Sequence, residues 1–277
     1  VWMRQMIDKY EAAAKASGAR IMFSCGYDSV PFELGTFFVQ EEAKRVFGAP
    51  AARVKGRVRD MRGTLSGGTA ASAKATFDAV AKDLSLVAIL NNPFALTPGF
   101  EGPKQPRGSK PAYEKDLHSW TAPFMMALIN TRNVHRSNML MGFPYGRDFV
   151  YDEMVLTGPG EKGEANAKKV MALNSEKTGP SAPKPGEGPS KEERENGRYD
   201  LLYLAVAPDG RMVRAGIKGD RDPGYGSTSK MISECAICLL RDTPDVAPGF
   251  WTPGAAMQGK LIKRLVDHAG LTFEVEK

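Results

Sequence analysis

The residues with the most promising chemistry stand together in one short stretch, Cys25-Gly-Tyr-Asp-Ser-Val-Pro31. The apolar run 21–23 in front of it is typical of a short buried strand, and a helical pattern of apolar residues follows over 32–46. Open α/β sheets bind ligands at the carboxyl ends of their strands, so Tyr27 and Asp28 are expected at the edge of a cleft. Both are candidate catalytic groups there, although Asp28 could also simply cap the following helix.

A glycine turn is the second candidate, in the run Ser66-Gly-Gly-Thr69 between a predicted strand over 53–61 and an alanine-rich helix. Glycines at a strand end, with Thr69 as the N-cap of the helix, would aim free backbone amides of Gly67 and Gly68 at an anion above the sheet. The alternative is a tight strand-to-helix turn that needs glycine dihedral angles. The sequence leaves both open.

A dense polar segment, residues 130–138, interrupts the apolar pattern of a helix predicted over 122–140. Arg132 and Arg136 lie one helical turn apart and could hold a carboxylate or phosphate between them. Such a face either lines a cleft or is solvated, and solvation is the simpler explanation for any one of these side chains. Arg132 is retained as a catalytic candidate and Arg136 as an anion-binding one.

Two familiar motifs are expected to be structural. Gly158-Pro-Gly-Glu-Lys-Gly163 matches the dinucleotide fingerprint, but Pro159 removes an amide donor and Glu161 would place a carboxylate beside the pyrophosphate. An ordinary turn is predicted. Cys235-Ala-Ile-Cys238 lacks a second pair of zinc ligands, and its thiols fall on an apolar helix face. They are predicted to pack in the core, with no metal site.

Composition narrows the class of protein. The 277 residues are 42% hydrophobic, enough for one large core or two modest ones, and no run resembles a membrane-spanning helix or a signal segment. Three dispersed cysteines suggest a reducing, cytoplasmic compartment. The net charge of +6 is partly concentrated in a Pro/Gly-rich loop without interleaved aromatic residues. We therefore expect no nucleic-acid partner, and either a solvated loop or an attraction to an anionic substrate or lipid headgroup at a membrane surface.

The remaining patterns predict a mixed α/β (α+β) fold. Four segments are expected to form a largely antiparallel sheet with helices packed on it: 53–61, 147–157, 199–207 and 211–218. Because the strand over 199–207 is apolar on both faces, one face is predicted to pair with a second copy of the chain in a homo-oligomer. The alternative is that helices of the same chain cover both faces. An uncapped helix from residue 1 onward suggests the downstream part of a longer protein.

Several of these segments together resemble the saccharopine dehydrogenase-like oxidoreductases, the group that includes trans-acting enoyl reductases. The segment 25–31 is similar to the family's C-G-F-D-S-V/I-P element, with Tyr27 in place of the usual Phe. Further blocks follow in the family's order: Ser66–Thr69, Asn130–Arg132 with Arg136–Asn138, Tyr145-Gly146, Gly186–Ser190, Gly219–Tyr225 and Trp251–Pro253. The resemblance covers essentially the whole chain. The family's glycine-rich nucleotide fingerprint lies upstream of all these blocks.

The resemblance implies that residues 1–50 are the C-terminal remnant of a Rossmann-type nucleotide-binding domain, and 51–277 a substrate and dimerisation domain. It implies an enzyme that transfers hydride from NAD or NADP to a C=C or C=N bond of a lipid-like or small carboxylated substrate. Neither cofactor is expected to bind this chain without the glycine loop, so the chain alone is expected to be inactive.

The expected site residues follow from the same resemblance. The catalytic candidates are Tyr27, Asp28, Arg132 and Tyr225; Cys25, Gly26, Tyr27 and Ser29 would border the nicotinamide; Gly67, Gly68, Thr69 and Arg136 would bind an anionic part of the substrate. The alternative is a non-catalytic dimerisation or lipid-associating module. That alternative predicts exposed apolar surface around 92–103 and 247–257, where Phe94, Phe100, Phe250 and Trp251 cluster with prolines.

Overall fold

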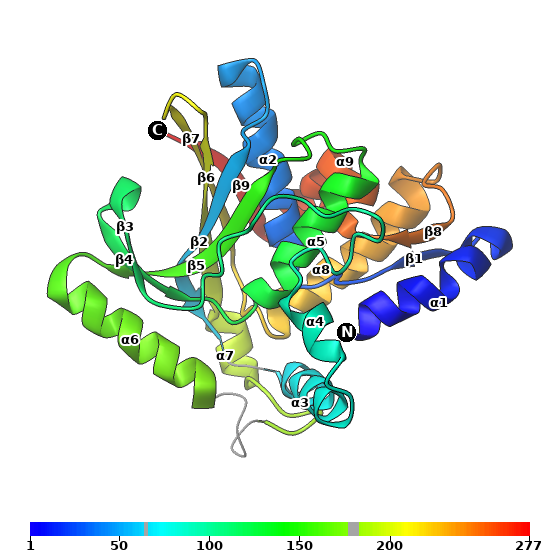
Figure 1. The fold of residues 1–277 in the computed structure, drawn as a ribbon, viewed down its shortest axis with the longest axis horizontal. Helices are drawn as coiled ribbons and strands as arrows, with labels where there is room; N and C mark the ends of the chain where they lie inside the picture. The colour runs from blue at the N-terminus through cyan, green and yellow to red at the C-terminus, as the bar shows by residue number, and fades with distance from the viewer. Residues whose placement is uncertain (64–65, 177–182) are drawn as a thin grey trace.

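The computed structural model describes residues 1–63, 66–176 and 183–277 (Figure 1). The helices are α1 (Trp2–Ser17), α2 (Val30–Phe47), α3 (Gly67–Lys82), α4 (Leu86–Asn91), α5 (Ala127–Leu140), α6 (Gly160–Glu176), α7 (Lys191–Asn196), α8 (Gly226–Ile237) and α9 (Pro253–His268), with a 3-10 turn at Lys115–Leu117 and a π turn at Cys238–Asp242. The strands are β1 (Arg20–Met22), β2 (Arg53–Arg62), β3 (Ala112–Glu114), β4 (Ser119–Pro123), β5 (Val150–Gly158), β6 (Arg198–Val206), β7 (Met212–Gly219), β8 (Gly249–Trp251) and β9 (Leu271–Glu276). The predicted α/β class is confirmed.

Within the described residues, seven strands form one mixed sheet in the order β3-β4-β5-β2-β6-β7-β9. Only the central pair β2 and β5 runs parallel, and the other neighbours in this sheet are antiparallel. All four predicted strands are therefore present and paired in one largely antiparallel sheet. Helices α2, α5, α8 and α9 lie on one side of it, and α6 crosses near the β4–β5 end (Figure 1).

Helix α2 carries the main contact between the helical layer and the sheet. Pro31 stands in its first turn, and Gly48, with a φ of 77°, ends it in the left-handed conformation. A Cβ added to Gly35 would lie 2.4 Å from the ring of Tyr203, so only glycine lets α2 approach β6 this closely. The Tyr203 hydroxyl also donates a hydrogen bond to the Pro31 carbonyl, at 2.9 Å. The start of α2 is thus held firmly against the middle of the sheet.

The opposite face of β6 is buried within the same chain. Leu202 and Leu204 are each 1% exposed. Their cross-strand neighbours on this face are Arg57 and Lys55 of β2, and Arg214 lies opposite Leu204 on β7. Long charged side chains therefore surround both leucines. The sequence analysis expected this face to need a second copy of the chain to cover it. That reasoning was wrong, because the same chain covers the face. Homo-oligomerisation itself stays a prediction.

A second, two-stranded sheet is formed by β1 and β8. β1 pairs in parallel with β8, which comes from the far end of the sequence, and α1 packs beside both. Phe23 stacks on Phe250 with ring centroids 5.2 Å apart. The segment 25–29 therefore follows a strand that is not part of the large sheet. The division of the chain at residue 50 stays a prediction.

Three predicted elements differ in the structure. The helix predicted over 122–140 begins only at Ala127, because Ser119–Pro123 pairs as a strand with β3 and β5. The apolar run 21–23 and its neighbours predict a strand over 20–25, and the structure ends that strand at Met22. The apolar spacing over 227–241 predicts one helix, and the structure has a π turn after Ile237 in its place. Among the described residues, no helix has the length and apolar character needed to cross a bilayer.

Candidate functional site

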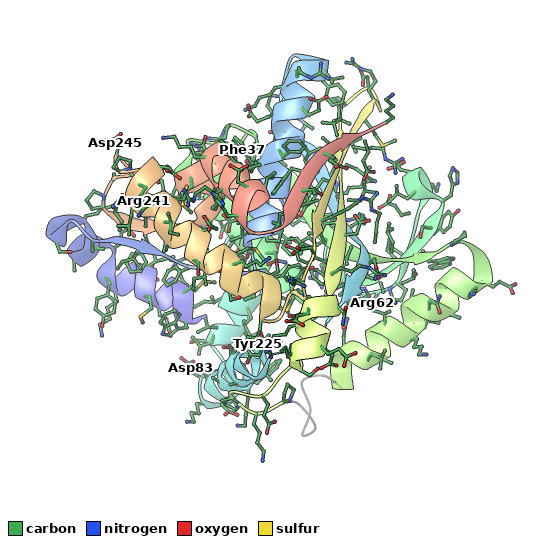
Figure 2. The ribbon with its side chains drawn as sticks, turned by 180° about the vertical axis from the view of Figure 1, so that it is seen from behind. Phe37, Arg62, Asp83, Tyr225, Arg241 and Asp245 are labelled. Carbon is green, nitrogen blue, oxygen red and sulfur yellow. The ribbon has the colours of Figure 1, made fainter. Side chains whose placement is uncertain are left out.

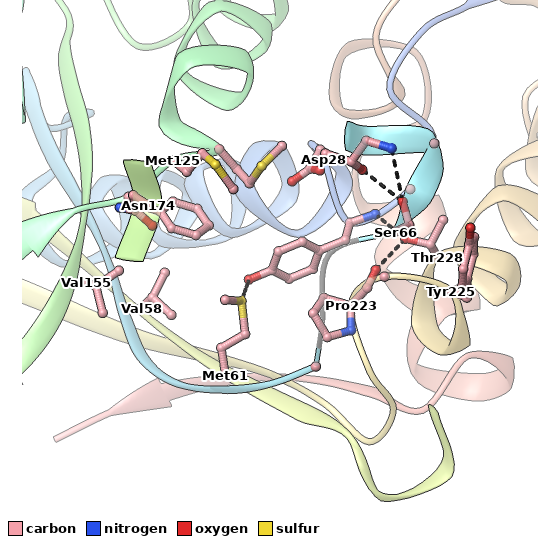
Figure 3. A pocket seen from close by; sticks show the side chains of 18 of the residues that line it. Asp28, Val58, Met61, Ser66, Met125, Val155, Asn174, Pro223, Tyr225 and Thr228 are labelled. Atoms are coloured by element: carbon pink, nitrogen blue, oxygen red, sulfur yellow. Dashed lines mark hydrogen bonds between the residues drawn. The ribbon is translucent and has the colours of Figure 1, made fainter. Parts of the chain in front are cut away.

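A cavity of about 600 Å³ opens between the segment after β1, the end of β2, the start of α5, helix α6 and the start of α8 (Figure 3). It brings together predicted site residues from three distant parts of the sequence: Gly26, Tyr27 and Asp28, then Gly68 and Thr69, then Tyr225. The rest of its wall has an apolar part, with Val58, Val155, Val170, Leu173 and Phe124–Met126, and a polar part that includes Arg59, Asp60, Ser72, Asn174 and Thr228. The expectation that the segment 26–28 borders a cleft is met; its role there is not tested by this placement.

Asp28 is the most unusual group in the cavity wall. Its Oδ1 atom is buried and has no hydrogen-bond partner among the described residues. Burial raises the pKa of the carboxyl from 3.8 to about 7, because the charged form is poorly solvated there. Asp28 does not cap the following helix. The N-cap residue of α2 is Ser29, and no side chain forms a capping hydrogen bond there. Asp28 is therefore free to act on a ligand.

Tyr27 forms part of the wall and part of the core. Its backbone amide donates to Thr228 Oγ1 at 2.9 Å, and its hydroxyl donates to Met61 Sδ at 3.6 Å. Its ring packs edge-on against Phe32 and Tyr199, with centroids 5.3 and 4.9 Å away. Burial raises the pKa of the phenol well above its usual value of 10. A hydroxyl in this setting stays protonated at neutral pH.

The three neighbours of Tyr27 differ in their access to the cavity. Gly26 lines it, and a Cβ there would lie 2.7 Å from Thr228 Cγ2. Ser29 is fully buried and accepts a hydrogen bond from Asn133 Nδ2 at 2.8 Å. Cys25 is not in the cavity lining and points its thiol toward backbone carbonyls of 22 and 23. The structure thus brings Gly26 to the cavity, but not Cys25 or Ser29.

The glycine turn before α3 is closed by its own chain. The helix starts at Gly67, two residues earlier than predicted, and its N-cap is Ser66 rather than Thr69. The Gly67 amide donates to the Glu187 carbonyl at 2.9 Å, and the Thr69 amide donates to Ser66 Oγ at 3.2 Å. A Cβ on Gly67 would lie 1.8 Å from the Lys184 carbonyl oxygen. These contacts support the tight-turn alternative, because two of the three amides are already used.

Arg132 and Arg136 do not reach the cavity. Arg132 binds the backbone carbonyls of 90, 92 and 128. Arg136 donates to the carbonyls of Leu96 and Phe250 at 2.7 and 2.8 Å, and it is 2% exposed. Each guanidinium ties distant loops to α5. The expected placement of this pair at a cleft was wrong.

Surface solvation of the polar segment 130–138 is also corrected. Most of its side chains are buried and hydrogen-bonded to other elements. Asn138, for example, donates to the Gly146 carbonyl at 2.8 Å and accepts from the Tyr145 amide at 3.0 Å. The segment is polar because its side chains satisfy both buried polar side chains, as Asn130 does for Glu153, and backbone groups of other segments inside the protein.

Tyr225 lies on the cavity wall beside α3 and α7 (Figures 2 and 3). Its hydroxyl donates to the Glu187 carbonyl at 3.1 Å, and its amide donates to Asp222 Oδ2 at 3.0 Å. A Cβ on Gly188 would lie 2.5 Å from its ring. Tyr225 and Gly67 therefore hold the same loop, residues 184–188, against the cavity.

Two buried carboxyl groups were not among the sequence-based candidates. Glu153, on β5, accepts from Asn130 Nδ2 at 2.9 Å, and burial raises its pKa to about 8. Glu33, on α2, accepts from Ser137 Oγ at 2.7 Å and from the Gly254 amide at 2.8 Å, and burial raises its pKa to about 7. The only signal in the sequence was an acidic residue inside an apolar pattern.

Comparison with known proteins places the chain in a family. No family model matches it. It is 33% identical over its whole length to a protein of Mycobacterium tuberculosis (strain H37Rv) provisionally named a trans-acting enoyl reductase, and it covers 72% of that protein. The trans-acting enoyl reductases of Mycobacterium ulcerans and Mycobacterium bovis are 29% and 27% identical over 96% of the chain, which covers 69% of each. The chain belongs to the trans-acting enoyl reductase family.

The described residues of this family member do not form a phosphate cradle at either glycine turn. At the turn before α6, a Cβ on Gly163 would lie 1.9 Å from the Gly158 carbonyl oxygen, and the Gly163 amide already donates to Pro159. That glycine serves close packing of the helix on the strand end. At the turn before α3, two of the three amides, those of Gly67 and Thr69, are occupied as described above. Neither turn suits the pyrophosphate of a dinucleotide.

The cysteine pair has a structural role as predicted. Cys235 and Cys238 are 2% and 0% exposed and belong to the main hydrophobic core. Across the described residues, no group of three or more histidine, cysteine or acidic side chains is arranged to hold a metal ion.

Proposed function

We propose that this protein reduces the carbon–carbon double bond of an enoyl substrate in the cavity beside Asp28. The single observation that carries the proposal is the half-buried Asp28, whose buried Oδ1 atom has no hydrogen-bond partner among the described residues, in the wall of a cavity with a broad apolar side. The names of the relatives support the reaction class, and the apolar walls suit a lipid-like substrate.

Such a reduction needs a hydride at one carbon of the double bond and a proton at the other. The raised pKa of Asp28 keeps a large share of its carboxyl protonated at neutral pH, so it can donate that proton. Phe124 and Met126 line the same cavity and would keep water away from the reacting carbons. Asp28 then recovers its proton from solvent.

A reduced nicotinamide, NADH or NADPH, would supply the hydride, and Gly26 and Tyr27 would border its ring. We propose that residues other than those of this chain bind its phosphates, because both glycine turns described here are closed. The resemblance to saccharopine dehydrogenase-like enzymes supports this, since their glycine fingerprint precedes the element matched by 25–31. This chain alone is therefore expected to be inactive with NADPH at ordinary concentrations.

The non-catalytic lipid-associating alternative has less support. It predicted exposed aromatic surface around 92–103 and 247–257. Phe94 and Phe250 are instead 6% and 4% exposed, and Phe94 packs on Phe100 and His135. These aromatic residues hold loops to the protein rather than facing a membrane.

The test separates the chemistry from cofactor binding. Purified chain is mixed with crotonyl-N-acetylcysteamine and N-benzyl-1,4-dihydronicotinamide, a hydride donor without phosphates, and the saturated thioester is measured by mass spectrometry. We expect turnover that falls by about a hundredfold or more in Asp28→Asn. NADPH titrated into the same chain by calorimetry is expected to give no measurable binding. Equal turnover by wild type and Asp28→Asn would refute the role of Asp28.

A further inference from the structure

A second cavity, of about 850 Å³, lies along α6 and the ends of β4 and β5. Its own lining combines the apolar residues Leu117, Leu156 and Pro159 with polar ones such as His118, Asn166 and Lys169. It shares four wall residues with the cavity beside Asp28: Arg59, Val155, Val170 and Leu173. The two cavities therefore meet at α6, although the proposed chemistry uses only the first.

The packing of α6 explains why space remains at this junction. Near its start, Gly163 and the fully buried Ala167 let the helix lie close to the strands. Near its end, Asn174 Nδ2 donates to the Pro123 carbonyl at 2.9 Å and fixes the helix to β4. Val170 lies between these anchors and is only half-buried, so its turn of the helix does not seal the space against the sheet.

The junction is suited to an alkyl chain. Val155, Val170 and Leu173 are aliphatic and offer no hydrogen bonds. The guanidinium of Arg59 is already paired with Asp200 at 2.7 Å and with Glu276 at 2.5 Å. Leu173 is 41% exposed, so the junction is open to solvent on one side, and a polar ligand group would find no hydrogen-bond partner in the three aliphatic side chains.

We infer that the hydrocarbon tail of the enoyl substrate passes from the cavity beside Asp28, across Val170 and Leu173, into the second cavity. This inference rests on the proposed function for the position of the double bond. It makes α6 the element that sets the chain-length preference, with Val170 at the junction and Leu117 at the far end.

Binding of a homologous series tests the path without any turnover. Trans-2-enoyl-N-acetylcysteamine thioesters, from crotonyl to hexadecenoyl, are titrated by calorimetry. In the wild type, affinity should rise about fourfold for each added methylene, which is about 0.8 kcal/mol, until the second cavity is filled. Val170→Phe should end this rise at a short chain and weaken the longest ligand by more than about tenfold, whereas Leu117→Trp should weaken only the longest ligands.

The matched control is Met171→Phe, on the same helix but 40% exposed and outside both cavity linings, which should keep the wild-type series. The decisive result is that Val170→Phe limits binding at a shorter chain length than Leu117→Trp does. Leu117→Trp keeps the test valid if Val170→Phe fails to fold. If these two variants weaken the binding of all chain lengths equally, or of none, the proposed tail path is refuted. A normal binding series without reduction of any thioester would instead refute the proposed function and leave the tail path standing.

Discussion

Replacing Asp28 with asparagine should make the protein more stable at alkaline pH while removing its proposed proton donor. Asp28 is half-buried and its buried Oδ1 atom has no hydrogen-bond partner among the described residues, so ionising the carboxyl in the folded state is unfavourable. Asparagine has nearly the same shape and no charge to solvate. A residue whose removal increases stability and abolishes activity is typical of a functional site.

The size of the effect follows from the pKa. Burial raises the pKa of Asp28 from 3.8 to about 7, a change of about three units, and each unit corresponds to about 1.4 kcal/mol. The folded state therefore binds more protons than the unfolded state between these two values. Stability falls as the pH rises through this window, and the loss levels off above pH 7 at about 4 kcal/mol at most. Asp28→Asn should remove this loss.

Urea unfolding followed by tryptophan fluorescence measures the effect at pH 5 and pH 8. The gain of Asp28→Asn over the wild type should be larger at pH 8 than at pH 5 by about 3 kcal/mol. Asp245→Asn is the control for the substitution itself, because that carboxyl is exposed on the surface (Figure 2).

The reasoning would be refuted by a wild type and an Asp28→Asn variant with parallel pH profiles. Asp28 would then be solvated in the folded protein, and its carboxyl would titrate as it does in the unfolded chain. The proposal that it donates a proton near neutral pH would lose its physical basis with it.

Two further predictions concern the structure around the site. Gly67→Ala should destabilise the protein by about 1–3 kcal/mol, because the new Cβ would lie 1.8 Å from the Lys184 carbonyl oxygen. Gly68→Ala, whose Cβ meets nothing closer than Ser66 Oγ at 3.9 Å, should be neutral or stabilising by up to about 1 kcal/mol in the same urea assay; equal effects at both positions would contradict the close contact. Arg136→Met should lower stability by about 2 kcal/mol, since the buried carbonyls of Leu96 and Phe250 lose their donors, and thermal melting that is unchanged would show that these carbonyls find water instead.

Local patterns were enough to predict most of the secondary structure. The apolar run over 199–207 and the strand-forming residues over 211–218, with the turn residues Pro208-Asp-Gly210 between them, are local features of the chain, and β6 and β7 formed as predicted. The strand at 119–123 was missed because it is defined by its partners on β3 and β5, and its own residues continue an apolar pattern into α5.

The same contrast between local patterns and distant partners explains which parts of the candidate site could be predicted. Small and polar residues directly after an apolar run predicted that Gly26 to Asp28 would border a cleft, because the end of a strand is a local feature. The groups that a long side chain contacts are not set by its neighbours in the sequence. Arg132 and Arg136 lie on one side of α5 as their spacing requires, yet the carbonyls that bind them come from the end of α4, the loop after it and strand β8.

The sequence by itself thus determined four strands of the large sheet (β2, β5, β6 and β7), the hairpin between β6 and β7, the position of Asp28 after β1 and the resemblance to a family of reductases. The tertiary structure alone decided which groups are buried without partners, which backbone amides are already used and where the cavities meet. Burial and hydrogen bonding depend on segments far apart in the chain, such as Asp28, Val155 and Tyr225 around one cavity. No local pattern contains that information, because the desolvation that raises the pKa of Asp28 is produced by all its neighbours together.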